Sequence, residues 1–440
     1  MPDASVNNDL LARHRAVLPS WMPLYYHDPI ELVAGSGRRV TDAAGRTYLD
    51  FFGGVLTNML GYDVAEVREA VERQLRTGIV HTSTLYLIRQ QVELAEKIAA
   101  RSGIRDARVF FTNSGSEANE AALLFATNTR RSNQVLAVRN GYHGRTFGAM
   151  AVTGTRSWSA SSLSPLQVAW LHFGDRLRGA YAGLPDADHI EAAVADLREV
   201  LATQVGGDVA ALIAEPIQGV GGFVIPPDGL FAAVREVLDE TGILFISDEV
   251  QTGWGRTGTH FWGYQAHGVV PDLLTFAKGV GNGLALAGVV GRAEVMEGVP
   301  GISFSTFGGN PVAAAAGNAV FDYLSRHDLQ ANAERVGSLL LDGLRSGLRD
   351  QPHVAEVRGR GLMIGVELVR PGGTVPDPAA AGVALEACRR DGLLVGRGGL
   401  YGNVLRIGPP LTLTEAEARE GLAILLDASR YRSDGGTPDR

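Results

Sequence analysis

Lys278 is the residue whose type and setting point most directly to chemistry. The chain holds 40 basic residues, and Lys97 and Lys278 are its only lysines. Lys97 falls in a helical pattern with a solvated face, whereas Lys278 follows the apolar run LLTFA. An ammonium group in apolar surroundings is costly unless it is paired or neutral. A neutral lysine is a nucleophile, which arginine cannot be because its guanidinium stays protonated. We therefore expect Lys278 to perform amine chemistry.

A carboxylate, Asp248, precedes this lysine by thirty residues and ends the apolar run ILFISD. In open α/β sheets, ligands bind beyond the carboxyl ends of the strands. The two apolar runs should therefore deliver Asp248 and Lys278 to one sheet edge. Such a pair could be a buried salt bridge. It could also be the two ends of a pyridoxal phosphate site, where the lysine forms a Schiff base with the aldehyde and the aspartate keeps the pyridine nitrogen protonated.

That cofactor also needs a phosphate cradle, and TNSGSEAN (112–119) stands where a strand should end and a helix begin. Ser114, Gly115 and Ser116 would place hydroxyls and free backbone N–H groups at the positive end of the helix dipole. Taken alone, this pattern is also that of an ordinary N-cap. A cradle, an aspartate and a lysine, each at a strand end and in this order, favour the cofactor site.

Alternating apolar runs and helical patterns predict the elements that position these residues. We expect strands at 107–112, 134–139, 211–215, 243–248, 273–277 and 286–291, with helices at 116–129, 310–325 and 328–349. Continuous apolar strands separated by helices predict a largely parallel sheet that is covered on both faces. A hairpin is expected over 38–52, and a helix over about 63–76 with Asp63 and Glu66 as its capping pair. Residues 155–185 follow no pattern that we can assign.

The length of 440 residues predicts more than one domain. We expect an N-terminal segment (1–60), a large domain (61–325) and a smaller α+β domain (326–440). The N-terminal segment should pack with the smaller domain. The polar tail 433–440 is expected to be disordered.

Composition excludes several classes of function. The net charge of -8 gives no basic face for nucleic acid. No stretch is long and apolar enough to span a membrane, and the N-terminus has no secretory signal. The single cysteine, Cys388, cannot form an internal disulfide, which favours a reducing compartment and predicts a cytoplasmic protein. We expect no metal site.

Eight motifs in one order resemble those of the class III (ω-type) aminotransferases over about residues 20–430. They are NSGSEANE (113–120), YHGRT (142–146), AEPIQG (214–219), ISDEVQTGWGRTG (246–258), FAKGVGNG (276–283), STFGGNP (305–311), RGRGLMIGVEL (358–368) and LRIGPPL (405–411). Further segments look most like the alanine–glyoxylate and ω-amino acid transaminase group. The chain has GYDVA (61–65) where many members have Gly-His-x-His-Pro.

The resemblance implies the PLP-dependent transferase fold of the aspartate-aminotransferase type (fold type I). It has a large domain with a mostly parallel seven-stranded sheet and a smaller α+β domain. The cofactor is pyridoxal 5'-phosphate. Lys278 would hold it and move protons, while Asp248 would pair with the pyridinium nitrogen. Tyr142 and Val250 would flank the ring, and Gln251 would approach its phenolic oxygen.

The remaining roles implied by the resemblance concern the phosphate, the substrate and the second subunit. Ser114, Gly115 and Ser116 would bind the phosphate with Thr306 of a partner subunit, so the expected assembly is a homodimer or a dimer of dimers with the site at the interface. Arg406 would bind a substrate carboxylate. Glu215 would lie by the cofactor and gate that arginine.

Several interpretations stay open beside these assignments. Leu56 could line the substrate pocket or simply pack in the core. His143 is more often a hydrogen-bonded structural residue than an acid or base. The expected reaction is ping-pong transfer of an amino group from an amino acid or ω-amino acid to a 2-oxo acid such as pyruvate or glyoxylate. A PLP-dependent phospho-lyase or epimerase on the same scaffold is the alternative, and a non-catalytic binding protein is a remote one.

Overall fold

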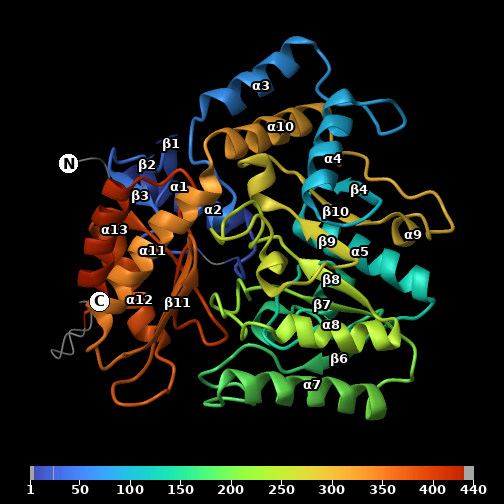
Figure 1. Cartoon of the computed structure of the whole chain (residues 1–440). Coiled ribbons are helices and arrows are strands. Elements are labelled where there is room, and N and C mark those ends of the chain that lie inside the picture. The colour runs from blue at the N-terminus through green and yellow to red at the C-terminus, as the bar shows by residue number, and fades with distance from the viewer. Residues whose placement is uncertain (1–3, 23, 431–440) are drawn as a thin grey trace.

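The larger part of the molecule is built on a seven-stranded sheet (Figure 1). The computed structural model describes residues 4–22 and 24–430, so the tail predicted to be disordered lies outside it. The strand order is β4-β10-β9-β8-β7-β5-β6. Strand β10 runs antiparallel to both neighbours and the other pairings are parallel, which confirms the predicted sheet. The strands are β4 (Ala107–Thr112), β5 (Gln134–Val138), β6 (Gln167–Leu171), β7 (Val209–Ala214), β8 (Leu244–Asp248), β9 (Leu273–Phe276) and β10 (Ala287–Arg292).

The central strands β7, β8 and β9 are buried at every position because helices cover both faces of the sheet. Successive strand side chains point to opposite faces. In β5, Val135 and Ala137 join the apolar cluster on the side of α5, whereas Leu136 and Val138 join the cluster on the other side. The helices of this part are α3 (Ala65–Arg76), α4 (Arg89–Arg101), α5 (Gly115–Arg130), α6 (Phe147–Ala151), α7 (Asp186–Thr203), α8 (Leu230–Thr241), α9 (Ala293–Met296) and α10 (Pro311–Arg326).

Two details of the predicted elements differ in the structure. The edge strand β6 lies within the stretch where the sequence follows no clear pattern. It pairs with β5 alone and is only partly buried. The predicted capping pair is wrong: α3 begins after Val64 without a side-chain cap. Asp63 has a φ of 51° and pairs with Arg68 instead.

The smaller part of the molecule, on the left in Figure 1, is an α+β unit. Its sheet has the order β11-β12-β15-β14 and packs against helices α11 and α12. Helix α13 packs on these two helices. The elements are α11 (Leu329–Leu348), β11 (Val354–Arg360), β12 (Met363–Leu368), α12 (Pro378–Arg390), β14 (Gly396–Gly398), β15 (Val404–Ile407) and α13 (Glu415–Ala428).

The N-terminal segment is joined to this smaller unit by a shared sheet. After α1 (Ala4–Val17), strands β1 (Leu32–Ser36), β2 (Arg39–Asp42) and β3 (Thr47–Asp50) form a meander that contains the predicted hairpin. Strand β13 (Leu393–Leu394) of the smaller unit then pairs in parallel with β3. A short helix, α2 (Gly53–Leu56), leads into the larger part. These contacts support the proposal that residues 1–60 pack with the C-terminal unit.

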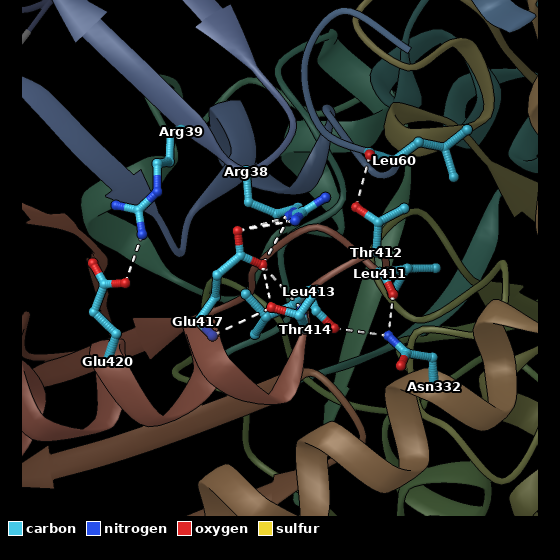
Figure 2. A network of polar contacts seen from close by, with 10 residues as sticks. All are labelled: Arg38, Arg39, Leu60, Asn332, Leu411, Thr412, Leu413, Thr414, Glu417 and Glu420. Atoms are coloured by element: carbon cyan, nitrogen blue, oxygen red, sulfur yellow. Dashed lines mark hydrogen bonds and ion pairs between the residues drawn. The ribbon is translucent and has the colours of Figure 1, made fainter. Parts of the chain in front are cut away.

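Ion pairs strengthen the same junction (Figure 2). Arg38 makes three hydrogen bonds of 2.9–3.1 Å with the carboxylate of Glu417, and both side chains are largely buried. Glu417 also completes the capping box of α13 with Thr414. The neighbouring pair, Arg39 and Glu420, has a single bond of 2.6 Å and is exposed. The Arg38–Glu417 pair should therefore stabilise the junction more than the Arg39–Glu420 pair.

No helix in the described part of the chain is long and apolar enough to cross a bilayer.

We predict that Glu417→Gln lowers the stability of the protein by about 1–3 kcal/mol, because it removes a bidentate, partly buried charge pair. Glu420→Gln is the matched control on the same helix and should cost less than about 1 kcal/mol. Urea unfolding followed by circular dichroism measures both. Equal effects of the two substitutions would contradict this prediction.

Candidate active site

A cavity of about 360 Å³ lies at the carboxyl edge of the large sheet. Five strand ends supply its lining. Ser114–Ser116 follow β4, Tyr142 follows β5, Glu215 follows β7, Asp248 ends β8 and Lys278 follows β9. Parallel strands present their carboxyl ends at one edge, so residues far apart in sequence meet there. The structure thus brings the predicted lysine, aspartate and cradle together.

Asp248 lines this cavity, and three hydrogen bonds hold its carboxylate. Its Oδ2 lies 2.8 Å from Asn119 Nδ2 and 2.8 Å from His143 Nδ1, and its Oδ1 accepts a 3.1 Å bond from the backbone N–H of Val250. The side chains of Asp248, Asn119 and His143 are all buried. Asn119 is fixed in turn by the Thr275 hydroxyl, which donates to its Oδ1 at 2.7 Å. A carboxylate with this many donors keeps a fixed orientation toward a bound ring.

Lys278 begins the turn that follows β9 and has a φ of 53°. This left-handed conformation costs a non-glycine residue roughly 1 kcal/mol or more. Burial lowers the pKa of Lys278 to about 8, against the opposing attraction of Asp248. Lys97, in contrast, lies in the middle of α4 and pairs with Asp322 at 2.6 Å. Only Lys278 is therefore placed to be neutral and nucleophilic close to neutral pH.

The N-terminus of α5 lies at the cavity, where the sequence predicts a phosphate cradle. The Ser114 hydroxyl is occupied as the N-cap, since it accepts from Glu117 N in a capping box. The backbone N–H groups of Gly115 and Ser116 belong to the first helical turn, which has no intrahelical acceptors. A Cβ on Gly144 would lie 2.4 Å from Ser116 Oγ, so this glycine permits the loop after β5 to approach the helix. The cradle therefore consists mainly of Gly115, Ser116 and the dipole of α5.

Tyr142 and Val250 also line the cavity. Behind Tyr142 lies Trp158, with the two ring centroids 5.8 Å apart in an edge-on arrangement. Trp158 comes from the stretch that could not be assigned from sequence, and the structure places it beside the site. Val250 packs against Gly115, where an added Cβ would lie 3.1 Å from its Cγ1.

Glu215, Gln251 and Arg406 form the polar wall of the site. Glu215 accepts bonds from Tyr142 N (2.9 Å) and Gly219 N (2.8 Å), and burial raises its pKa to about 7. Arg406 donates through Nη2 to Gln251 Oε1 at 2.7 Å. Because a guanidinium only donates, the amide oxygen of Gln251 must face it, and Nε2 is the donor that this side chain has left. Glu215 and Arg406, which are predicted to form a gate, make no hydrogen bond or ion pair with each other.

Arg406 is enclosed by aromatic rings. Its Cζ lies 4.7 Å from the ring centroid of Phe223 and 5.5 Å from that of Phe52. The side chain is buried, and burial lowers its pKa to about 10. It lies behind Gln251 and does not line the cavity.

Besides Arg406, two further predicted site residues lie outside the cavity of the single chain. Leu56 is buried in an apolar cluster with Ile217, Phe223 and Met363, and the adjacent Thr57 lines the cavity. Thr306 lies on an exposed loop and is absent from the lining. A role in a partner's site is compatible with that exposure.

Sequence reasoning did not assign the two partners of Asp248. His143 was expected to be a hydrogen-bonded structural residue, and it is hydrogen-bonded, but its partner is the key carboxylate. Asn119 lies one helical turn beyond the cradle, so the same helix serves both ends of the site. No local signal separates such residues from other buried polar ones, because their function depends on contacts across the fold.

The residues present fit pyridoxal phosphate. A helix N-terminus that lines the cavity suits the phosphate, an anchored carboxylate suits a ring nitrogen, and an amine of lowered pKa suits an aldehyde. Among the described residues, no group of three or more His, Cys, Asp and Glu side chains could hold a metal ion.

Comparisons with known proteins agree with this geometry. Residues 25–428 match the profile of the family described as aminotransferase class-III. A mitochondrial alanine–glyoxylate aminotransferase 2 homolog from Arabidopsis thaliana is 38% identical, over 95% of this chain and 86% of that protein. A phospholyase from Arthrobacter, solved with phosphoethanolamine, is 36% identical with a TM-score of 0.87, covering 96% of this chain and 99% of that one. An amine transaminase from an uncultivated Pseudomonas species, solved with PLP bound, is 32% identical with a TM-score of 0.85, covering 91% and 94%.

We predict that the cofactor-free protein captures pyridoxal phosphate faster as the pH rises to about 8, and that the rate then levels off. The reason is that the neutral amine of Lys278 is the reactive form, and its pKa is lowered to about 8. An ordinary lysine would react faster up to about pH 10.4. Stopped-flow absorbance measures the rate. Lys278→Arg should abolish capture and Lys97→Arg should preserve it; a rate that keeps rising beyond about pH 10 would contradict the prediction.

Proposed function

Because this chain belongs to the class III aminotransferases and uses pyridoxal 5'-phosphate, we propose that it moves an amino group from an amino acid or ω-amino acid to a 2-oxo acid such as pyruvate or glyoxylate. One observation carries this choice of acceptor. Arg406 is a buried guanidinium beside the cavity, and among the described residues no carboxylate pairs with it. A buried cation without a counter-charge is costly. A substrate carboxylate would supply that charge.

Each residue of the site has a role in this reaction. When bound, pyridoxal phosphate supplies an aldehyde that condenses with amines and a ring that withdraws electron density from the adjacent carbon. Asp248, held by Asn119 and His143, keeps the ring nitrogen protonated. Lys278 binds the aldehyde and, once released, carries a proton on Nζ between the two carbons that exchange it. Tyr142 and Val250 would confine the ring, and the Nε2 group of Gln251 would donate to its phenolic oxygen.

Two differently shaped substrates must use the same cavity in a ping-pong reaction. Arg406 would bind the carboxylate of the 2-oxo acid once Gln251 moves aside. Glu215, which lines the same cavity, would neutralise the arginine as a carboxylate when a donor without a carboxylate at that position is bound. This exchange of partners would allow one site to accept an ω-amino donor and a 2-oxo acid in turn.

A second candidate function is a PLP-dependent phospho-lyase. It is favoured by the similarity to the Arthrobacter phospholyase, which extends over 96% of this chain. An elimination would consume an amino alcohol phosphate and release inorganic phosphate without leaving an amino group on the cofactor. The products therefore separate the two candidates.

We also propose that the active unit is at least a dimer. Large apolar side chains project from two loops: Leu85, Tyr86 and Leu87 on one, and Ile302, Phe304 and Phe307 on the other. Leu87 and Ile302 are 99% and 96% exposed in the single chain. The loops are in contact, because the rings of His81 and Phe307 lie 4.7 Å apart. Thr306 lies among these residues, where a subunit interface would bring it to a partner's cradle.

The function is tested by adding single amino donors to the yellow holoenzyme. We expect at least one amino acid or ω-amino acid to bleach the visible band and pyruvate or glyoxylate to restore it. Lys278→Ala should not catalyse turnover. Phosphoethanolamine is the control for the alternative: release of inorganic phosphate with the band preserved, and no donor that bleaches it, would replace aminotransfer with elimination.

The interface is tested with Leu87→Asp, which should convert the protein to monomers in sedimentation velocity. Leu163→Asp changes a similarly exposed leucine outside the two loops and should leave the assembly intact. Thr306→Val should raise the Kd for pyridoxal phosphate about tenfold, since it removes one hydrogen bond to the phosphate. A wild-type monomer of 46.7 kDa would refute the proposal.

A further inference from the structure

A buried group of charges joins the larger and smaller parts of the molecule close to the site. We call Arg178, Arg358, Glu356 and Glu367 the junction cluster. Arg178 lies between β6 and α7 in the larger part, and the other three lie on β11 and β12. Glu367 is 6% exposed and accepts from Arg178 through Oε1 and from Arg358 through Oε2, the latter at 2.6 Å. One buried carboxylate therefore pairs with guanidinium groups from both parts of the molecule.

Further bonds hold both arginines in place. Arg178 Nε donates to Thr374 O at 2.7 Å, and its guanidinium lies 5.9 Å from the ring centroid of Tyr401. Arg358 also pairs with Glu356 at 2.6 Å, but that carboxylate is 36% exposed and does not reach Arg178. Water screens the attraction between charges that it reaches, so the exposed Glu356 should stabilise the junction less than the buried Glu367 does.

Arg358 also binds the backbone of the larger part. Its Nε donates to Gly222 O at 3.0 Å. Gly222 has a φ of 105°, and a Cβ there would meet Val404, Arg358 and Gly399 at 3.0–3.1 Å. The next residue, Phe223, has a φ of 55°, which is unfavourable for a side chain of this size. This strained backbone is maintained only if the surrounding contacts hold it.

The loop 219–223, which Arg358 holds at Gly222, contacts both residues that we assign to substrate selection. At one end, Gly219 N donates to Glu215 at 2.8 Å. At the other, the Phe223 ring lies 4.7 Å from Arg406. Between them, Val220 O accepts from Gly399 N at 2.9 Å, which ties the loop to the segment beside β14.

We propose that Arg358 and Glu367 are positioning residues that fix loop 219–223, and through it Glu215 and Arg406, for binding of a substrate carboxylate. This inference rests on the proposed function, because it gives Arg406 that role. Neither residue touches the cavity. Loss of the Glu367 charge leaves Arg178 unpaired and frees Arg358 to turn toward Glu356, so its bond to Gly222 weakens.

The first test compares Glu367→Gln with Glu356→Gln. Both substitutions remove a carboxylate that accepts a 2.6 Å bond from Arg358. Of the two carboxylates, only that of Glu367 also accepts a bond from Arg178. In the holoenzyme, Glu367→Gln should raise the KM for pyruvate about tenfold and leave the KM for butanal, an acceptor without a carboxylate, within about twofold. Glu356→Gln should match the wild type. Arg406→Leu is the comparator and should show the same selectivity with a larger effect.

The second test does not depend on activity. Hydrogen–deuterium exchange of the holoenzyme should be at least about tenfold faster at residues 219–223 in Glu367→Gln than in the wild type, and unchanged in Glu356→Gln. Arg358→Lys keeps the charge but cannot bridge two carboxylates and a carbonyl, so it should behave like Glu367→Gln. It serves as the test if Glu367→Gln does not fold.

The outcomes distinguish this inference from the proposed function. If the wild type uses no 2-oxo acid, the proposed function fails, and unchanged exchange at 219–223 in the variants would also overturn the positioning role. If the wild type is a transaminase but the variants raise both KM values equally, or Glu356→Gln matches Glu367→Gln, the inference is wrong while the function stands.

Discussion

The site depends on the cost of burying charge at one edge of the large sheet. Asp248 and Arg406 are buried there, Glu215 lies beside them, and Lys278 follows the next strand. None of these four side chains forms an ion pair with another of the four. Asp248 is held by amide and imidazole donors, Glu215 by backbone N–H groups and Arg406 by an amide oxygen. Backbone N–H groups orient Glu215 and an amide oxygen orients Arg406 without neutralising either charge, so both charges stay available to a substrate.

Parallel strands make this arrangement possible. Each strand ends at the same edge, and the polar residue that follows it needs no long loop to reach the cavity. Helix α5 adds a second element to the same place. Its N-terminus provides the cradle, and one turn further Asn119 reaches Asp248 at 2.8 Å. A shift of this helix would therefore disturb the phosphate and ring ends of the site together.

The smaller unit takes part in the site through β15, which carries Arg406, whereas its partners Gln251 and Phe223 belong to the larger part. Relative movement of the two units would change the distance between the carboxylate-binding group and the cavity. The junction cluster restrains that movement with buried charges. In the proposed mechanism the fold separates two tasks: residues at the edge of the large sheet would hold the cofactor, and the junction between the units would position the residues that select the substrate.

Lys278, Asp248 and the helix N-terminus at Gly115 could be predicted from sequence alone, because each follows an apolar run whose end is also a strand end. The parallel sheet follows from the same local signal. Only the tertiary structure decided which donors hold Asp248 and that Arg406 lies beside two aromatic rings behind Gln251. These bonds join residues 105, 129 and 155 positions apart. Local patterns carry no information about such pairs, since the partners meet only when strand order and packing of the units are complete.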